Sequence, residues 1–123
     1  SYYWPKRGGN NMATSFSPHV GPKSLDKEPA WVWKNDNDEL MRHGPSIDGE
    51  GNVYVVTAMG WVRKFSPDGE LLWVWRTTLE EGRIQVCGAL HEGSIYFAST
   101  GNGDGGYVFS LDMASGKVNF RTH

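Results

Sequence analysis

Residues 49–56 read Gly-Glu-Gly-Asn-Val-Tyr-Val-Val, and a similar stretch, Glu-Gly-Ser-Ile-Tyr-Phe-Ala, returns at residues 92–98. Gly51 corresponds to Gly93, and Tyr54 corresponds to Tyr96 at the same spacing. Internal similarity with a period of about 20–50 residues indicates an architecture that stacks one supersecondary unit on the next. The repeat therefore predicts that the fold is built from similar units in succession.

The repeat continues on both sides of the quoted stretch. Residues 61–73 resemble residues 107–120, since both contain a glycine turn followed by an aromatic residue. The sequence Trp-Val-Trp-Lys at 31–34 recurs as Trp-Val-Trp-Arg at 73–76. The sequence thus contains two full copies of the repeat, preceded at residues 31–34 by the last segment of a third copy.

Each full copy is predicted to form four antiparallel strands. The apolar runs at 53–56 and 95–98 are hydrophobic on both faces, which indicates strands between two other layers. The turn Ser-Pro-Asp-Gly at 66–69 combines the fixed φ of proline with the positive φ that glycine allows. The expected strands are residues 45–48, 52–58, 61–65 and 71–76 in the first copy, and 85–90, 94–99, 107–111 and 118–122 in the second.

Four-stranded units that pack against copies of themselves are typical of β-propeller blades. We therefore predict an all-β fold with about two blades, one extra strand and an incomplete ring; a single small β-sandwich is the alternative. The expected division is an extended N-terminal arm at 1–25 and a partial propeller at 26–123. Within the propeller we expect a lone strand near 31–34, a blade at 44–77 and a blade at 85–122.

Composition excludes several classes of protein. The 123 residues carry a formal net charge of −2, so no basic footprint for nucleic acid is present. No apolar run approaches the roughly 20 residues that span a bilayer. The single cysteine, Cys87, permits no internal disulfide and is expected to be a small buried side chain in a strand.

The turn segments resemble the repeat of PQQ-like (quinoprotein alcohol dehydrogenase-like) β-propellers. Residues 111–120 are similar to the pattern Ala-Leu-Asp-x-x-Thr-Gly-x-x-x-Trp, and residues 68–73 to its shorter variant. The resemblance implies that Trp73 docks on a neighbouring blade, whereas Phe120 lacks the indole donor and would make an apolar contact only. It also favours an extracytoplasmic location, in the periplasm, outside the cell or in an organelle lumen.

A set of glycines, aspartates and aromatic residues is assigned to this structural repeat. The glycines allow positive φ in the turns, the aspartates accept hydrogen bonds from turn N–H groups, and the aromatic rings bury apolar surface. The assigned residues are Gly51, Tyr54, Asp68, Gly69, Trp73, Gly93, Tyr96, Asp112, Gly116 and Phe120.

Candidate chemistry is sparse. The acidic residues Asp36, Asp38 and Glu39, and Asp104 in a glycine-rich loop, are weak candidates for calcium because it prefers oxygen ligands. The first cluster lacks the glycine of an EF-hand loop, and the glycine-rich loop lies between two expected strands rather than before a helix. The sequence predicts no catalytic residue, no metal and no cofactor.

The predicted function is a non-catalytic binding or scaffold module that mediates protein–protein contacts. Its partners would be other subunits of a larger complex, which includes membrane-attached assemblies, or the rest of its own propeller. One alternative is the N-terminal part of a PQQ- and calcium-dependent quinoprotein dehydrogenase; the second is a sugar- or calcium-binding module. The candidate partner contacts are Tyr2, Tyr3, Trp4, Trp31, Trp33 and Trp75.

Overall fold

The computed structural model describes residues 28–34, 40–103 and 105–123, and this part of the chain is all-β. Eight strands form two separate four-stranded antiparallel sheets, in the orders β1-β2-β3-β4 and β5-β6-β7-β8. We call them the first and the second blade. The strands are β1 (Ser46–Ile47), β2 (Val53–Val56), β3 (Trp61–Phe65), β4 (Leu71–Arg76), β5 (Ala89–His91), β6 (Ser94–Ser99), β7 (Tyr107–Asp112) and β8 (Val118–Thr122).

The two blades repeat the same register. In the first blade Tyr54 pairs with Lys64, and the partner of Lys64 on β4 is Trp73. In the second blade Tyr96 pairs with Ser110, whose partner on β8 is Phe120. Each blade also has a register shift at the same place, after Lys64 and after Ser110. A shared bulge kinks the outermost strand in the same way, which confirms that the sequence repeat is a structural repeat.

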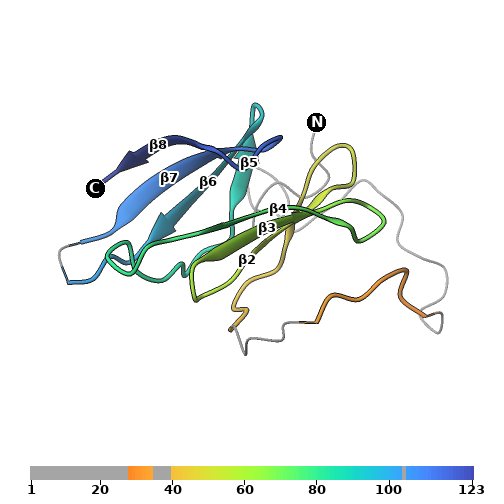
Figure 1. The fold of residues 1–123 in the computed structure, drawn as a ribbon, viewed down its shortest axis with the longest axis horizontal. Helices are drawn as coiled ribbons and strands as arrows, with labels where there is room; N and C mark the ends of the chain where they lie inside the picture. The colour runs from red at the N-terminus through yellow and green to blue at the C-terminus, as the bar shows by residue number, and fades with distance from the viewer. Residues whose placement is uncertain (1–27, 35–39, 104) are drawn as a thin grey trace, which may run out of the picture.

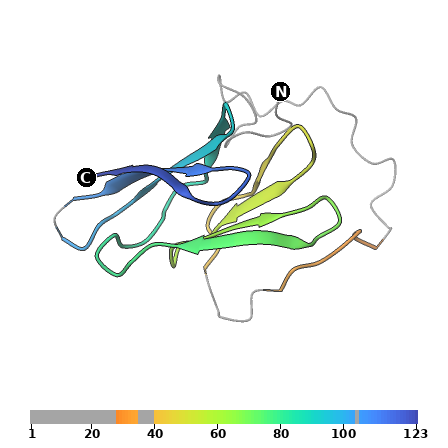
Figure 2. The ribbon, with the colours of Figure 1, turned by 45° about the horizontal axis from the view of Figure 1, so that its top comes forward.

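The core lies between the blades. Figures 1 and 2 show the two sheets as two layers, with the segment 28–34 and strand β8 on opposite sides of the first blade. Trp73 and Trp75 of β4 pack against this core from its edge. The buried cluster comprises Tyr54, Val56, Val62, Ile84, Leu90, Ile95, Phe97, Phe109, Leu111 and Met113.

The first strand of each blade is shorter than the sequence predicts. The strand expected at 85–90 begins only at Ala89, and two of the carbonyls before it have partners near β1. His43 Nε2 contacts the carbonyl of Gln85, and Ser46 Oγ donates to the carbonyl of Gly88. Cys87 therefore lies outside any strand and is only half-buried, contrary to expectation.

Residues 31–34 run beside the first blade without forming the expected strand. A strand requires a hydrogen-bonded neighbour, and the described residues supply none for this segment. Trp31 and Trp33 instead lie against Phe65, each with 5.6 Å between ring centroids. Within the described ranges, no helix is long and apolar enough to cross a membrane.

Candidate functional site

Trp73 on β4 connects the first blade to the second. Trp73 Nε1 donates to the carbonyl of Met113 at 2.9 Å, and Lys64 Nζ donates to the same oxygen at 2.9 Å. A Cβ placed on Gly116 would lie 2.7 Å from the indole ring, closer than side-chain atoms approach one another. The turn thus needs glycine both for its φ of 75° and for the space the ring occupies.

The same contact occurs one blade earlier. Trp31 Nε1 donates to the carbonyl of Pro67 at 2.8 Å, and a Cβ on Gly69 would lie 2.7 Å from the Trp31 ring. Trp31 is therefore to Gly69 what Trp73 is to Gly116. Each tryptophan docks on the hairpin turn of the blade that follows it in the chain.

The docking turns are held by short polar side chains. Asp112 accepts hydrogen bonds from Ser115 N at 2.9 Å and Ser115 Oγ at 2.8 Å, and these bonds lower the pKa of its carboxyl. In the first blade Ser66 takes this place, since its Oγ accepts from Glu70 N at 3.1 Å. The sequence assigned that role to Asp68, which is exposed. Tyr54 pairs with Lys64 as Tyr96 pairs with Ser110, so Ser66 and Asp112 each lie two residues after an equivalent position.

A second carboxylate organises the entry to the first blade. Asp48 accepts from Asn52 N and from the Tyr54 hydroxyl, each at 2.9 Å, and from Asn52 Nδ2 at 3.0 Å. Burial alone would raise the pKa of Asp48, but these hydrogen bonds together outweigh it and hold the pKa below its ordinary value. Tyr54 is thus anchored at its hydroxyl, whereas Tyr96 packs with its ring against Phe120. These carboxylates are committed to structure.

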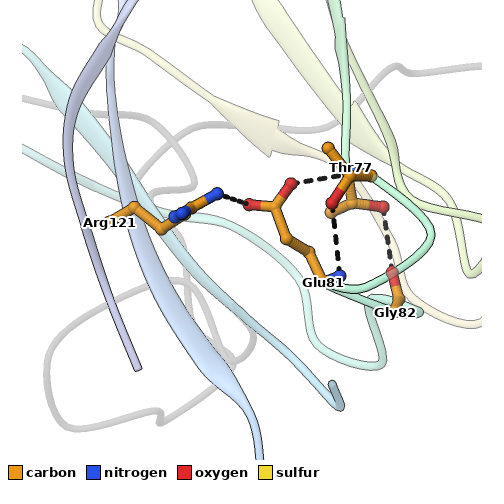
Figure 3. A network of polar contacts seen from close by, with 5 residues as sticks. Thr77, Glu81, Gly82 and Arg121 are labelled. Carbon is orange, nitrogen blue, oxygen red and sulfur yellow. Dashed lines mark hydrogen bonds and ion pairs between the residues drawn. The ribbon is translucent and has the colours of Figure 1, made fainter. Parts of the chain in front are cut away.

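The connection between the blades is tied to the last strand through Glu81 (Figure 3). The Glu81 carboxylate accepts from Thr78 N at 2.8 Å and pairs with Arg121 on β8 at 3.2 Å. Burial alone would raise the pKa of the Glu81 carboxyl. The hydrogen bonds from Thr78 and the pairing with Arg121 outweigh this effect, so the pKa lies below its ordinary value. Thr77 Oγ1 donates to the carbonyl of Gly82 at 2.9 Å, which closes the same loop. The sequence contained no signal for this network, because its partners lie on different elements.

The outward face of the second blade has no neighbour among the described residues. By register, Val108 occupies the position of Val62, and Phe120 that of Trp73. Val62 is 0% exposed, whereas Val108 is 45% and Phe120 46% exposed. We call this surface the open face; it is formed by Tyr96, Ala98, Val108, Phe120 and Thr122.

Three of the candidate partner contacts lie within the described residues. Trp31 and Trp33 cover the first blade, and the Arg63 guanidinium lies 4.7 Å from the Trp33 ring centre. Trp75 packs edge-on against Phe97 and Phe109, inside the interface between the blades. Tyr2, Tyr3 and Trp4 lie outside the described residues.

The candidate calcium ligands Asp36, Asp38, Glu39 and Asp104 also lie outside the described residues. Within the described ranges, no group of three or more histidine, cysteine, aspartate or glutamate side chains is placed to hold a metal ion. Asp48, Glu81 and Asp112 are each engaged by neighbouring N–H and O–H groups or by arginine. The donor set of this part of the chain does not fit a metal-bound quinone.

Four-stranded sheets stacked face to face and closed by tryptophan docking define a section of a β-propeller. The solved structures that share this fold include "Europium-containing methanol dehydrogenase", with 17% identity and a TM-score of 0.58 over 68% of this chain. They also include the quinohemoprotein alcohol dehydrogenase ADHIIG from Pseudomonas putida HK5, with 22% identity and a TM-score of 0.56 over 66% of this chain. The matches cover only 15% and 13% of those two chains. No protein-family model matches the sequence, and no curated protein does.

These matches confirm the resemblance to PQQ-like propellers at the level of the fold. They also correct one prediction. The sequence predicts no cofactor, but the structures that share its fold are titled as europium-containing and as a quinohemoprotein. The prediction of no cofactor was therefore wrong.

Proposed function

We propose that this chain contributes two consecutive blades to a larger β-propeller, and that its open face binds the next blade of that propeller. The observation that carries the proposal is the positional match between the open face and the buried face of the first blade. Val62 is buried by the second blade, and Val108 has the same place in the repeat without cover. A ring usually takes four to eight blades, so two blades leave such a face to be filled.

The role of these residues is then that of a scaffold. Trp73 and Gly116 illustrate the rule by which one blade accepts the next: an aromatic side chain projects from the outer strand and a glycine turn receives it. Phe120 would dock on the glycine turn of the next blade through ring contact alone, since its side chain has no N–H to donate. The incoming blade would bring the glycine turn.

Cysteine accessibility tests this proposal on the full-length polypeptide. In a Cys87→Ser background, Val108→Cys should react with a thiol reagent as slowly as Val62→Cys, because both would be covered. The matched exposed control is Leu79→Cys, since Leu79 is 89% exposed. Mass spectrometry of the native polypeptide would show in parallel whether further blades are present.

If Val108→Cys reacts as fast as Leu79→Cys in the full-length protein, the open face is free in solution and the proposal fails. A native mass that corresponds to 123 residues would direct the same labelling experiment to the intact assembly isolated from the source. Fast labelling there would refute blade docking in any form.

A second function is favoured by the comparisons. We propose that the longer propeller is a dehydrogenase of the quinoprotein type, which the fold match to two alcohol-oxidising enzymes supports. An extracytoplasmic location belongs to the same proposal. Dye reduction by the full-length protein with methanol or ethanol, in the presence of added quinone and metal, would test it. No dye reduction under any loading would contradict this activity and leave the docking proposal intact.

A further inference from the structure

A cavity of about 870 Å³ opens where three segments meet at one end of the blades. The segments are the β2–β3 turn, the connection between the blades and the β6–β7 loop. Ligand pockets commonly fall between about 300 and 1,000 Å³, so the volume suits a small molecule. Its lining residues are Met59, Arg76, Thr77, Thr78, Leu79, Gly82, Arg83, Thr100, Gly101 and Asn102.

The wall that carries Arg83 is fixed by backbone contacts. Arg83 N donates to Thr100 Oγ1 at 3.3 Å, and Thr100 N donates to the carbonyl of Arg83 at 2.9 Å. Gly82 approaches Gly101 so closely that a Cβ on Gly82 would collide with the backbone there. Ile84, which follows Arg83 in the chain, is buried and forms an antiparallel β-bridge with Ser99. The cavity wall is therefore built before any ligand arrives.

The charged residues that line the cavity are all positive. Arg76 and Arg83 line it, and none of the described lining residues is acidic. Two carboxylates adjoin the lining residues in sequence: Glu81 is buried and pairs with Arg121, and Glu80 is exposed and is not among the lining residues. Arg76 is held by stacking, with its guanidinium 4.7 Å from the centre of the Trp61 ring. The charged residues among the described lining residues are thus both arginines, in a chain whose net charge is negative.

The cavity also has an apolar side. Met59 is 41% exposed and Leu79 is the most exposed of the large hydrophobic side chains in the described residues. Guanidinium groups bind carboxylates through paired, charge-assisted hydrogen bonds. We propose that this cavity binds a small organic carboxylate, with the acid group at Arg76 and Arg83 and an apolar body against Met59 and Leu79.

Titration of the full-length protein with benzoate, followed by calorimetry or saturation-transfer NMR, tests the proposal. Benzyl alcohol is the uncharged probe of similar size, and inorganic phosphate is an anion without an apolar body. We expect benzoate to bind more tightly than either. Arg83→Gln should weaken benzoate binding by about tenfold or more, because hydrogen bonds to charged groups are among the stronger polar contacts.

The matched control is Arg42→Gln, which removes an exposed arginine that does not line the cavity. Thermal melting of each variant would show that the fold is retained, and Arg83→Lys would separate charge from paired hydrogen bonding. Equal binding of benzoate and benzyl alcohol would overturn the proposal. So would benzoate binding that Arg83→Gln leaves unchanged, or that Arg42→Gln weakens to the same degree.

Discussion

The buried face of the first blade and the open face of the second are the same surface in two situations. Val62 and Val108 occupy equivalent positions, yet one is fully buried and the other about half exposed. The difference arises from the neighbour and not from the strand, because both strands carry the same pattern and pair in the same register. In a repeat protein, each unit therefore carries an interface whether or not its partner is present.

The two faces also differ in chemistry. Trp73 and Trp75 of the first blade correspond by register to Phe120 and Thr122 of the second. The open face thus has smaller side chains along its outer strand and no indole N–H. A blade that docks there would have to fill the extra space with larger side chains of its own.

The largest expected effect comes from placing a charge on each face. Val62→Asp should destabilise the chain by more than about 3 kcal/mol, because it buries an unpaired carboxylate between the blades. Val108→Asp should change the stability of the isolated chain by less than about 0.5 kcal/mol, because water can solvate the charge there. Thermal and urea unfolding followed by circular dichroism would measure both.

The same pair of substitutions in the full-length protein tests whether the difference persists. If the open face is covered there, Val108→Asp becomes as damaging as Val62→Asp. Equal tolerance of both substitutions in the isolated chain would show that the blades do not pack as described.

A smaller effect is expected at the docking turn. Gly116→Ala places a methyl group against the Trp73 ring and forces alanine to a φ of 75°. Gly93→Ala meets a similar φ of 79°, but nothing lies within 4 Å of its Cβ. Alanine at such φ costs roughly 1–2 kcal/mol, and overpacking adds about 1–3 kcal/mol at Gly116 only. Comparative unfolding of the two variants isolates the docking contact, and equal losses would argue against it.

The smallest expected effect is on the loss of folding stability at acidic pH. The folded-state pKa of Glu81 lies below its ordinary value of 4.5, so its stabilising contribution is complete at neutral pH. This contribution is lost as the pH falls below the ordinary value and through the lowered one. Glu81→Gln should cost about 1 kcal/mol at pH 7 and reduce the dependence of the melting temperature on pH between 7 and 3. Asp48 and Asp112 would retain part of that dependence, since their pKa values are also lowered.

The neighbouring Glu80→Gln is the control, because Glu80 is exposed. It should leave both the melting temperature at pH 7 and the acid sensitivity nearly unchanged. An identical response of the two variants would mean that the pair between Glu81 and Arg121 contributes nothing to the connection between the blades.

Much of the fold could be predicted because it depends on local pattern. The apolar runs identify the strands β2 and β6, although only β2 is covered on both faces, since Ala98 of β6 is exposed. The positive φ of Gly69 and Gly116 follows from the turn chemistry. The spacing of the repeat then gives the order of strands in each blade. These features need only the neighbouring residues, whose φ, ψ and side-chain alternation are set by residue type.

Contacts between distant elements could not be predicted in this way. Residues 31–34 look like a strand, but pairing requires a partner on another element. Asp68 resembles the motif aspartate, whereas the strand register gives that place to Ser66, because Lys64 and Ser110 are equivalent and each lies two residues earlier. Three further features depend on how the blades stack in space. They are the contacts of His43 and Ser46 with the carbonyls before β5, the Glu81–Arg121 pair, and the cavity beside Arg83.

The amino-acid order of this protein thus dictates the blade, its turns and the aromatic residue that projects from its outer strand, since these follow from propensities acting over a few residues. Tertiary packing determines which blade face is covered, which carboxylates are engaged and where a cavity remains. The physical reason is that burial and desolvation depend on the neighbour that a surface meets. The open face is the clearest case, because its sequence encodes an interface and its exposure shows that no neighbour lies on it among the described residues.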